Sequence, residues 1–451
     1  MWLFIAGGAL TVTVTFVIVA AFARSRAERY AALQWSLQGS LVERLARGRW
    51  LAAFARAIGV AGLLLVVLAG IAGTQNPHTS IVPTLVWILW WVGFIYVAML
   101  VGNLWPVLNP WRTLYDLFPG KRGKREAARE KFPEQCAGWI ALAALLVFGW
   151  IELIFPYRAT PAVLAGLALA YSAITWWGMA RYGPEAWLEN ADPFHRLFEL
   201  LSRFAPCALR ADGALLLRPY AAGLVSLSRE RRGVSTAETG FIIAMLAIVL
   251  FDGFQASKHW SALEDLVHAL HPDLGDAGWV ALHTAGLLAM WLAFVGLYLG
   301  ACAVAHRFAG GGGTVLGYAR AFAPALVPIA VGYQFAHTFV YLIMQGQNIV
   351  SLVSDPLGLG WNLFGTRDIA PDPALISAKT AWTLALAAIV TGHAISVLLA
   401  DIAAGRLLGS GPRALRALLP MTLLMVLYTI ISLQILAEPL VRYSGPQETI
   451  I

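Results

Sequence analysis

The sequence predicts an all-α polytopic membrane protein with about ten transmembrane helices and amphipathic helices on its cytoplasmic surface. Two observations predict this class. Hydrophobic residues make up 59% of the 451 residues and charged residues only 13%, which is about half the charge of a typical soluble domain. The apolar residues also form continuous runs of about 18 residues or more, long enough to cross the hydrocarbon core as helix. These runs lack the strict alternation of a membrane β-barrel.

We expect one membrane domain over 1–451, with ten spanning helices. The expected spans are 2–22, 54–72, 84–104, 137–156, 161–180, 237–257, 278–304, 321–345, 379–400 and 418–440.

The distribution of positive charge predicts the orientation of these spans. Of the 32 Lys and Arg, 27 fall just inside the second span or in every second connecting segment, namely 23–53, 105–136, 181–236, 305–320 and 401–417. Lys and Arg collect on the cytoplasmic side of membrane proteins. We therefore expect both termini outside. The excess of arginine over lysine and the abundance of alanine are compatible with a GC-rich bacterial genome, and hence with the bacterial inner membrane. The net charge of +7 needs no nucleic acid to explain it.

Three cytoplasmic stretches have the pattern of amphipathic helices lying on the membrane surface. In 24–50 a leucine stripe recurs at i,i+4, formed by Leu33, Leu37, Leu41 and Leu45. The stretches 109–117 and 192–200 begin with Asn-Pro and Asp-Pro, an N-cap residue followed by proline at the first helical position.

The last two of these stretches resemble each other at an offset of 83 residues, and each follows a predicted transmembrane hairpin. This predicts a tandem duplication of a hairpin plus an amphipathic helix, covering 54–120 and 137–203. Convergence of two helices on a similar composition stays open as the alternative.

The second half of the chain has two irregular features. Pro324, Pro328 and Gly332 lie in the eighth predicted span, and proline removes a helical hydrogen bond, so we expect a kink or break there. The outer loop 346–376 is apolar and rich in glycine. It is a candidate for a re-entrant lid, which is tolerated where it is buried in protein or lines a cavity.

Ionisable residues within membrane spans are costly and therefore mark candidate sites. Those in 237–440 are Glu238, Asp252, His283, His337 and His393, and Glu152 lies in the fourth span. At a rise of about 1.5 Å per residue, Glu152, Asp252, His283 and His337 all fall near the outer surface. Polar residues at similar heights are expected to bind a substrate, namely Tyr333, Gln334, Tyr341, Gln345 and Gln347. We infer an outward-facing polar cavity between the sixth, seventh and eighth spans.

Four of these residues are candidate metal ligands. Asp252, His283, His337 and His393 offer the nitrogen and oxygen atoms that bind divalent transition metals such as zinc or copper. No closely spaced metal motif accompanies them, and His393 lies deeper than the others. The alternative that these histidines are buried hydrogen-bonding residues stays open.

Several short motifs resemble one family. They are Asn109-Pro110-Trp111-Arg112, Phe251-Asp252, Ala336-His337 leading to Gln345-Gly346-Gln347, Ser354-Asp355-Pro356, Trp361-Asn362-Leu363 and Gly392-His393. Together they resemble the bacterial multi-pass membrane proteins known as fenitrothion hydrolase. The resemblance implies hydrolysis of an organophosphate triester. It adds Asp355 and Asn362 to the candidate site, leaves His283 outside its pattern, and assigns no catalytic role to any residue.

Three functions remain open from the sequence. The first is a hydrolase in which a divalent ion held by His337 and Asp252, with or without His393, activates water and polarises the phosphoryl oxygen. The second is a transporter of a metal ion or small solute, with Asp252 or Glu238 as its proton-coupled carboxylate. The third is a subunit of a membrane complex, with a partner chain or a second copy completing the site.

Overall fold

The computed structural model describes residues 32–40, 48–117, 130–209, 214–229, 234–409 and 411–442, together with Leu10, Val14 and Glu43, with the backbone alone at 229 and 436–442. Apart from Leu10 and Val14, the first predicted span, 2–22, lies outside the described residues.

Within the described part of the chain, nine helices are long and apolar enough to cross a membrane. They are Arg49–Ala72, Ile81–Leu100, Glu134–Leu153, Pro161–Tyr182, Thr236–Gln255, Asp276–Phe308, Val315–Leu352, Ala378–Leu408 and Pro412–Ile435. Each coincides with one of the predicted spans from 54–72 onward. The predicted all-α class is therefore confirmed, and the length and composition of these helices agree with a polytopic membrane protein.

The first half of the described chain contains the following elements. They are β1 (Trp35–Ser36), α4 (Arg49–Ala72), α5 (Ile81–Pro83), the π-helix η1 (Thr84–Gly93), α6 (Phe94–Leu100), α7 (Trp105–Leu108), α8 (Pro110–Leu117), η2 (Glu134–Cys136), α10 (Trp139–Leu153), α11 (Pro161–Tyr182), α12 (Pro184–Asn190) and α13 (Pro193–Ser202).

The second half continues with a hairpin and the longer helices. Its elements are β2 (Cys207–Leu209), β3 (Leu215–Leu217), α14 (Ala222–Arg229), α15 (Thr236–Gln255), α16 (Lys258–Leu270), α17 (Asp276–Phe308), α18 (Val315–Phe322), the 3-10 turn η3 (Ala323–Leu326), α19 (Val327–Gly346), α20 (Asn348–Leu352), α21 (Ala378–Leu408) and α22 (Pro412–Arg442).

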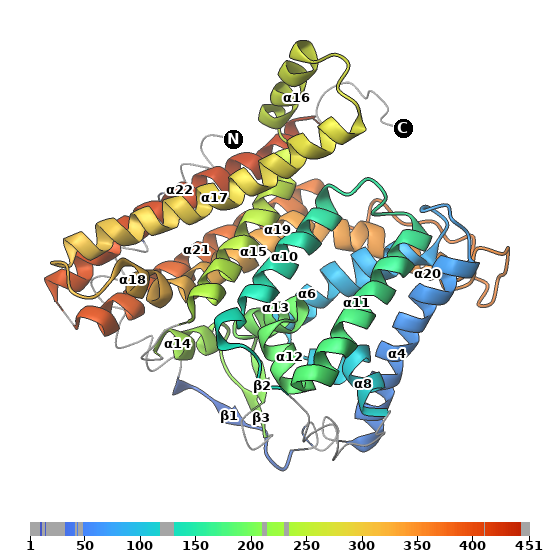
Figure 1. Cartoon of the computed structure of the whole chain (residues 1–451), viewed down its shortest axis with the longest axis horizontal. Helices are drawn as coiled ribbons and strands as arrows, with labels where there is room; N and C mark the ends of the chain where they lie inside the picture. The colour runs from blue at the N-terminus through green and yellow to red at the C-terminus, as the bar shows by residue number, and fades with distance from the viewer. Residues whose placement is uncertain are drawn as a thin grey trace.

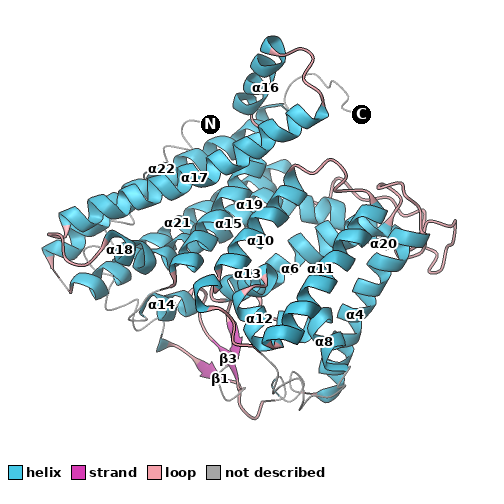
Figure 2. Ribbon diagram, in the orientation of Figure 1, coloured by secondary structure: helices cyan, strands magenta, loops and turns pink. Residues whose placement is uncertain are grey.

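The helices form a bundle whose ends are distinct. Figure 1 shows α17 and α22 side by side along one edge and α4 and α11 at the opposite edge, with α15 and α19 between them. The helix α16, which follows α15, lies at the top of this view, whereas α8, α12 and the strands lie at the bottom. Figure 2 shows the strands only at this lower end. The two ends therefore carry different local structure.

The predicted amphipathic helix over 24–50 does not continue through 33–40, where the structure describes a strand and a turn. Trp35–Ser36 form β1, which pairs antiparallel with β3 in a small sheet of order β1-β3-β2. A turn follows at Gly39, with a φ of 80°, and the amide of Leu37 donates to the carbonyl of Leu215. The leucine spacing is local, whereas this pairing joins segments far apart in sequence and overrides the helical pattern.

The predicted helix at 192–200 exists as part of α13, and its apolar side packs against protein. Asp192 caps α13 as expected, accepting from the amides of Phe194 and His195 at 2.9 Å each. The apolar side of the helix is buried by protein: Phe194 is 4% exposed and Phe198 fully buried. Phe194 packs edge-on against Trp90 of η1, with ring centroids 4.6 Å apart. The amphipathic pattern thus reflects packing against other helices.

The eighth predicted span is interrupted as its prolines predict. The helix α18 ends at Phe322, a 3-10 turn contains Pro324, and α19 begins again with Pro328 in its first turn. Beyond the break, α19 packs closely against α21. A Cβ added at Gly392 would lie 2.4 Å from the carbonyl oxygen of Pro328. Small residues allow such close approach of two helix backbones.

Candidate functional site

The candidate site is built where the C-terminal end of α15 meets α19. The hydroxyl of Ser235 caps α15 by accepting from the amide of Glu238, and most of the helix is buried among its neighbours. Gly253 allows α19 to approach, because a Cβ there would lie 2.4 Å from the hydroxyl oxygen of Tyr333 and 3.6 Å from the His337 ring. The glycine thus brings the polar face of α19 against Asp252.

Asp252 and His337 form a direct pair. Nε2 of His337 donates to Oδ2 of Asp252 over 2.8 Å. The side chain of His337 is 23% exposed and that of Asp252 is 43% exposed, so the pair can be reached from outside the bundle. Of the predicted site residues, these two are the ones that the structure brings into hydrogen-bonding contact.

Tyr333 extends the pair towards the interior. Its ring stacks on His337, with centroids 5.8 Å apart and planes inclined by 15°. Its hydroxyl is buried and has no hydrogen-bond partner among the described residues. Tyr333 also lines a small cavity of about 10 Å³ together with Tyr428 and Ser432, which is close to the room that one water molecule needs.

A second carboxylate lies near the pair. Glu152 of α10 accepts a hydrogen bond from the indole Nε1 of Trp91, and its negative charge interacts with that of Asp252. Tyr341 interacts electrostatically with both carboxylates and with Arg158. Glu152, Asp252, His337, Tyr333 and Tyr341 therefore form one cluster drawn from α10, α15 and α19.

The orientation of Trp91 depends on the π-helix η1. This helix spans ten residues, Thr84–Gly93, and π-helical segments are rare and frequent at functional sites. Both Trp90 and Trp91 point into the bundle, where Trp91 also packs on Phe148 with centroids 4.5 Å apart. Sequence reasoning missed Trp91, because the helical period of 3.6 residues does not apply in a π-helix.

His283 lies in a different contact. Its Nε2 is 3.3 Å from Oε1 of Glu264 on α16, and its Nδ1 is 3.0 Å from the carbonyl oxygen of Trp279. The indole Nε1 of Trp260 also reaches Nε2 over 3.3 Å. His283 therefore holds α16 against α17 and does not join Asp252.

His393 is isolated in the contact between α21 and α19. It is 1% exposed, its Nδ1 lies 2.8 Å from the carbonyl oxygen of Ile389, and its Nε2 is buried without a partner among the described residues. Among those residues, no three His, Cys, Asp or Glu side chains are close enough together to hold a metal ion. The four predicted ligands thus yield one pair and two separate histidines.

Three predicted substrate-binding residues lie in the loop 346–376, and their side chains form hydrogen bonds within that loop. Asp355 accepts from the amides of Leu359 and Gly360 at 2.8 Å each. Asn362 accepts from the amide of Arg367, and Gln347 exchanges two hydrogen bonds with the backbone of Asp372. These contacts explain why a glycine-rich loop keeps a defined path.

The remaining predicted residues have local partners. Gln345 accepts from the side-chain amide of Asn348, and Gln334 donates to the hydroxyl of Thr338 over 3.3 Å. Glu238 lies in the first turn of α15, at the opposite end from Asp252, with its Oε2 3.3 Å from Arg196. Glu238 is thus remote from the cluster.

The loop 346–376 contains α20 followed by turns. Several apolar side chains of this loop are exposed, including Leu359, Trp361, Leu363 and Phe364. The amide of Thr74, after α4, donates to the carbonyl of Leu357. The loop is therefore attached to the end of α4.

No family model matches the chain, and neither a curated protein nor a solved structure is significantly similar to it. The resemblance to fenitrothion hydrolase proteins therefore rests on the motifs alone.

Proposed function

We propose that this protein couples the binding of a proton at Asp252 and His337 to the movement of a small solute or ion across a bacterial inner membrane. The observation that carries the proposal is the 2.8 Å contact between the imidazole of His337 and the carboxylate of Asp252. Ionisable pairs on membrane-spanning helices are recurrent elements of proton relays.

The orientation in the membrane is part of this proposal. The chain would have ten spans, with both termini outside. The five connecting segments that hold 26 of the 32 Lys and Arg would lie in the cytoplasm, with Arg56 just inside the second span. Asp252 and His337 then lie towards the outer surface, and α8, α12 and the small sheet lie towards the cytoplasm.

The cluster has the groups needed to take up and pass on a proton. The imidazole and the carboxylates exchange protons readily, and removal of a proton from the pair leaves Asp252 with its charge uncompensated beside Glu152. Tyr333 and the water-sized cavity that it shares with Tyr428 and Ser432 offer a route from His337 towards the interior. The break between α18 and α19 supplies a discontinuous helix beside the site, which is a common device in transporters.

Proton flux into proteoliposomes tests this proposal. A membrane potential is imposed with potassium and valinomycin, and an internal pH-sensitive dye reports proton entry. We expect flux above that of empty liposomes in the wild type and background flux in Asp252→Asn. Because asparagine keeps the shape of the side chain, a loss is attributable to the missing charge. Equal flux in both proteins would contradict the proposal.

Hydrolysis of a phosphotriester is the second candidate, and the same pair favours it. A carboxylate that orients an imidazole produces a general base for water. A zinc or copper ion at Asp252 and His337 would have to complete its coordination with water or substrate, because the described residues offer no third His, Cys, Asp or Glu ligand.

Release of nitrophenol from an aryl phosphotriester distinguishes the two candidates. Hydrolysis that is lost in His337→Gln, without proton flux in the wild type, would favour the hydrolase. Elemental analysis of the wild type beside His337→Ala then decides whether a metal takes part.

A further inference from the structure

A large pocket lined by both charged and apolar side chains opens at the opposite end of the bundle from Asp252 and His337. Its volume is about 870 Å³, and its walls come from α4, α7, α8, α12 and α13. This is within the usual size of ligand sites, about 300–1,000 Å³. The pocket shares no residue with the site described above, so its occupant is independent of the proposed function.

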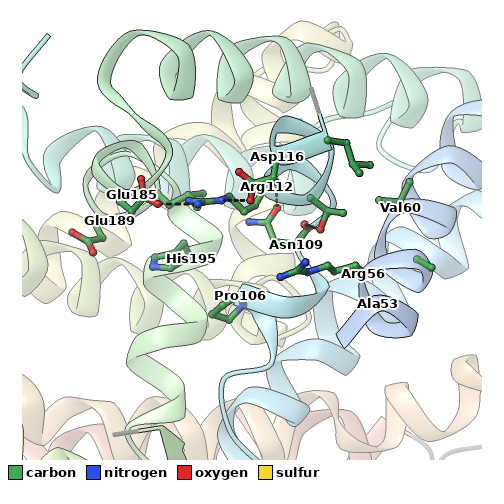
Figure 3. A pocket seen from close by; sticks show the side chains of 14 residues that line it. Ala53, Arg56, Val60, Pro106, Asn109, Arg112, Asp116, Glu185, Glu189 and His195 are labelled. Atoms are coloured by element: carbon green, nitrogen blue, oxygen red, sulfur yellow. Dashed lines mark hydrogen bonds and ion pairs between the residues drawn. The ribbon is translucent and has the colours of Figure 1, made fainter. Parts of the chain in front are cut away.

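Two charged side chains of the pocket, Arg56 and Glu189, lie on opposite walls. Figure 3 shows Arg56 reaching from α4 towards Asn109, while Glu185, Glu189 and His195 lie on the other side. Among the described residues, Arg56 and Glu189 have no ion-pair partner. Within the described part of the chain, the pocket therefore presents a cation without an ion-pair partner on one wall and an anion without one on the other.

A second cation, Arg112, lies between these walls, and two carboxylates already neutralise its charge. The guanidinium of Arg112 lies 2.8 Å from Asp116 and 2.8 Å from Glu185. Burial opposes its charge, but the two carboxylates outweigh burial and hold the pKa of Arg112 above its ordinary value. Arg112 is thus held in place by two ion pairs, and Arg56 is the arginine that can contact a ligand.

A buried amide on the pocket wall lacks a partner. Asn109 is 1% exposed, and its Oδ1 accepts from the amide of Arg112 at the start of α8. Its Nδ2 has no hydrogen-bond partner among the described residues, and neither does Nδ1 of His195. Leaving a buried donor unsatisfied costs about 1–3 kcal/mol, so Asn109 is built to donate to an acceptor that enters the pocket.

The apolar part of the pocket continues onto the lipid-facing side of α4. Ala53, Ala57 and Val60 line it. On the same helix Phe54 is 63% exposed and Ile58 is 50% exposed, as expected of side chains that face acyl chains. A ligand with a polar head in the pocket can therefore extend an apolar tail along α4.

We propose that this pocket binds the headgroup of a phospholipid that carries a phosphate and a primary ammonium, the phosphatidylethanolamine class. The phosphate accepts from Arg56 and from Nδ2 of Asn109, and the ammonium donates to Glu189. The acyl chains lie along α4. A choline headgroup cannot donate to Glu189, and a glycerol headgroup has no cation for it.

Native mass spectrometry of the full chain tests the proposal. The delipidated protein in detergent is titrated with phosphatidylethanolamine, phosphatidylcholine or phosphatidylglycerol of identical acyl chains. One charge-assisted hydrogen bond corresponds to about a tenfold change in affinity. We expect phosphatidylethanolamine to bind about tenfold more tightly than the other two lipids, and Glu189→Gln to remove that preference.

Asn109→Asp is the sharpest variant. Aspartate keeps the oxygen that caps α8 but replaces the unpartnered donor with an acceptor facing the phosphate. Binding should fall at least about tenfold, with unchanged elution on size exclusion. Asn103→Asp is the matched control, because Asn103 also accepts from a local amide, that of Trp105, and does not line the pocket. Arg49→Ala serves in the same way for Arg56→Ala, since both arginines lie near the start of α4.

Four results would overturn the proposal. They are equal binding of the three lipids, unchanged binding in Asn109→Asp, tightest binding of phosphatidylglycerol, and full displacement of the lipid by water-soluble glycerophosphoethanolamine at equal concentration. The third would indicate a site for anionic lipid, and the fourth a site for a soluble phosphate ester.

Discussion

The two polar regions of this protein differ in how their groups are satisfied. At one end of the bundle, Asp252 and His337 satisfy each other over 2.8 Å, and the small cavity beside Tyr333 measures about 10 Å³. At the other end, Asn109 and His195 retain unpartnered nitrogens around a pocket of about 870 Å³. A proton needs almost no room, whereas a lipid headgroup needs volume and free hydrogen-bonding groups. The difference is the one expected if the first region binds a proton and the second binds a ligand.

The largest effect is expected from a substitution that forces α19 away from α21 and so disrupts the part of the bundle that holds Asp252 and His337. In Gly392→Val the new side chain would collide with the carbonyl of Pro328, because even a Cβ lies 2.4 Å from that oxygen. Overpacking of this kind costs about 3 kcal/mol or more when backbone must move. We expect little monodisperse protein by fluorescence-detected size exclusion. Gly300→Val is the control, since a Cβ at Gly300 meets nothing within 4 Å.

A smaller substitution should disturb the contact between Asp252 and His337 while the bundle stays folded. In Gly253→Ala the methyl group would lie 2.4 Å from the Tyr333 hydroxyl oxygen, so Tyr333 must move away from α15, and the His337 ring that stacks on it is disturbed with it. We expect a loss of stability of about 1–2 kcal/mol and a proton flux reduced at least about tenfold, the size that a small misplacement of acting groups produces. Gly296→Ala, on an open face of α17, should leave both unchanged. Normal flux in Gly253→Ala would show that the close approach is not needed.

The smallest effect is expected at Asp192, the residue that caps the start of α13. This carboxylate accepts from two amides of α13 and from the hydroxyl of Tyr171 at 2.7 Å. Burial raises the pKa of Asp192, and these hydrogen bonds only partly oppose the rise. The folded protein therefore holds the proton more tightly than the unfolded chain. The free energy of unfolding should fall as pH rises from the unfolded pKa, near 3.8, through the folded one.

Two substitutions separate the cap of α13 from its charge. Asp192→Asn keeps an accepting oxygen and should remove the fall in stability with pH, whereas Asp192→Ala should cost about 1 kcal/mol at every pH. Thermal unfolding in detergent between pH 4 and pH 7 measures both. Neither variant should change proton flux, and an effect on flux would mean that the two regions are coupled.

The sequence predicts what depends on local chemistry. Hydropathy locates the nine spans, Asp192 before proline gives the start of α13, and Pro324 marks the break before α19. Asp252 and His337 were predicted at similar depth, and they meet. The tandem duplication stays a prediction. The order of elements agrees with it, because each half has two long helices, a short helix and a helix that begins with Asx-Pro.

The sequence fails where partners come from distant segments. His283 was expected beside Asp252, but Glu264 of α16 lies 3.3 Å from it. The leucines near Leu37 follow a helical spacing, but pairing with β3 places this segment in a sheet. The lipid pocket was missed because Arg56 and Glu189 are ordinary surface residues in the sequence. Only the packing of α4 beside α8 and α12 places them around one cavity.

Charge displacement on a solid-supported membrane tests the central claim most directly, because it detects proton binding within the membrane without any transported solute. A jump in external pH is applied to proteoliposomes containing the wild type, Asp252→Asn or His337→Gln. The account predicts a transient current in the wild type that falls to the level of empty liposomes in both variants, with Gly296→Ala retaining it. Transients of equal size in the wild type and in both variants would contradict the assignment of Asp252 and His337 as the proton-binding pair.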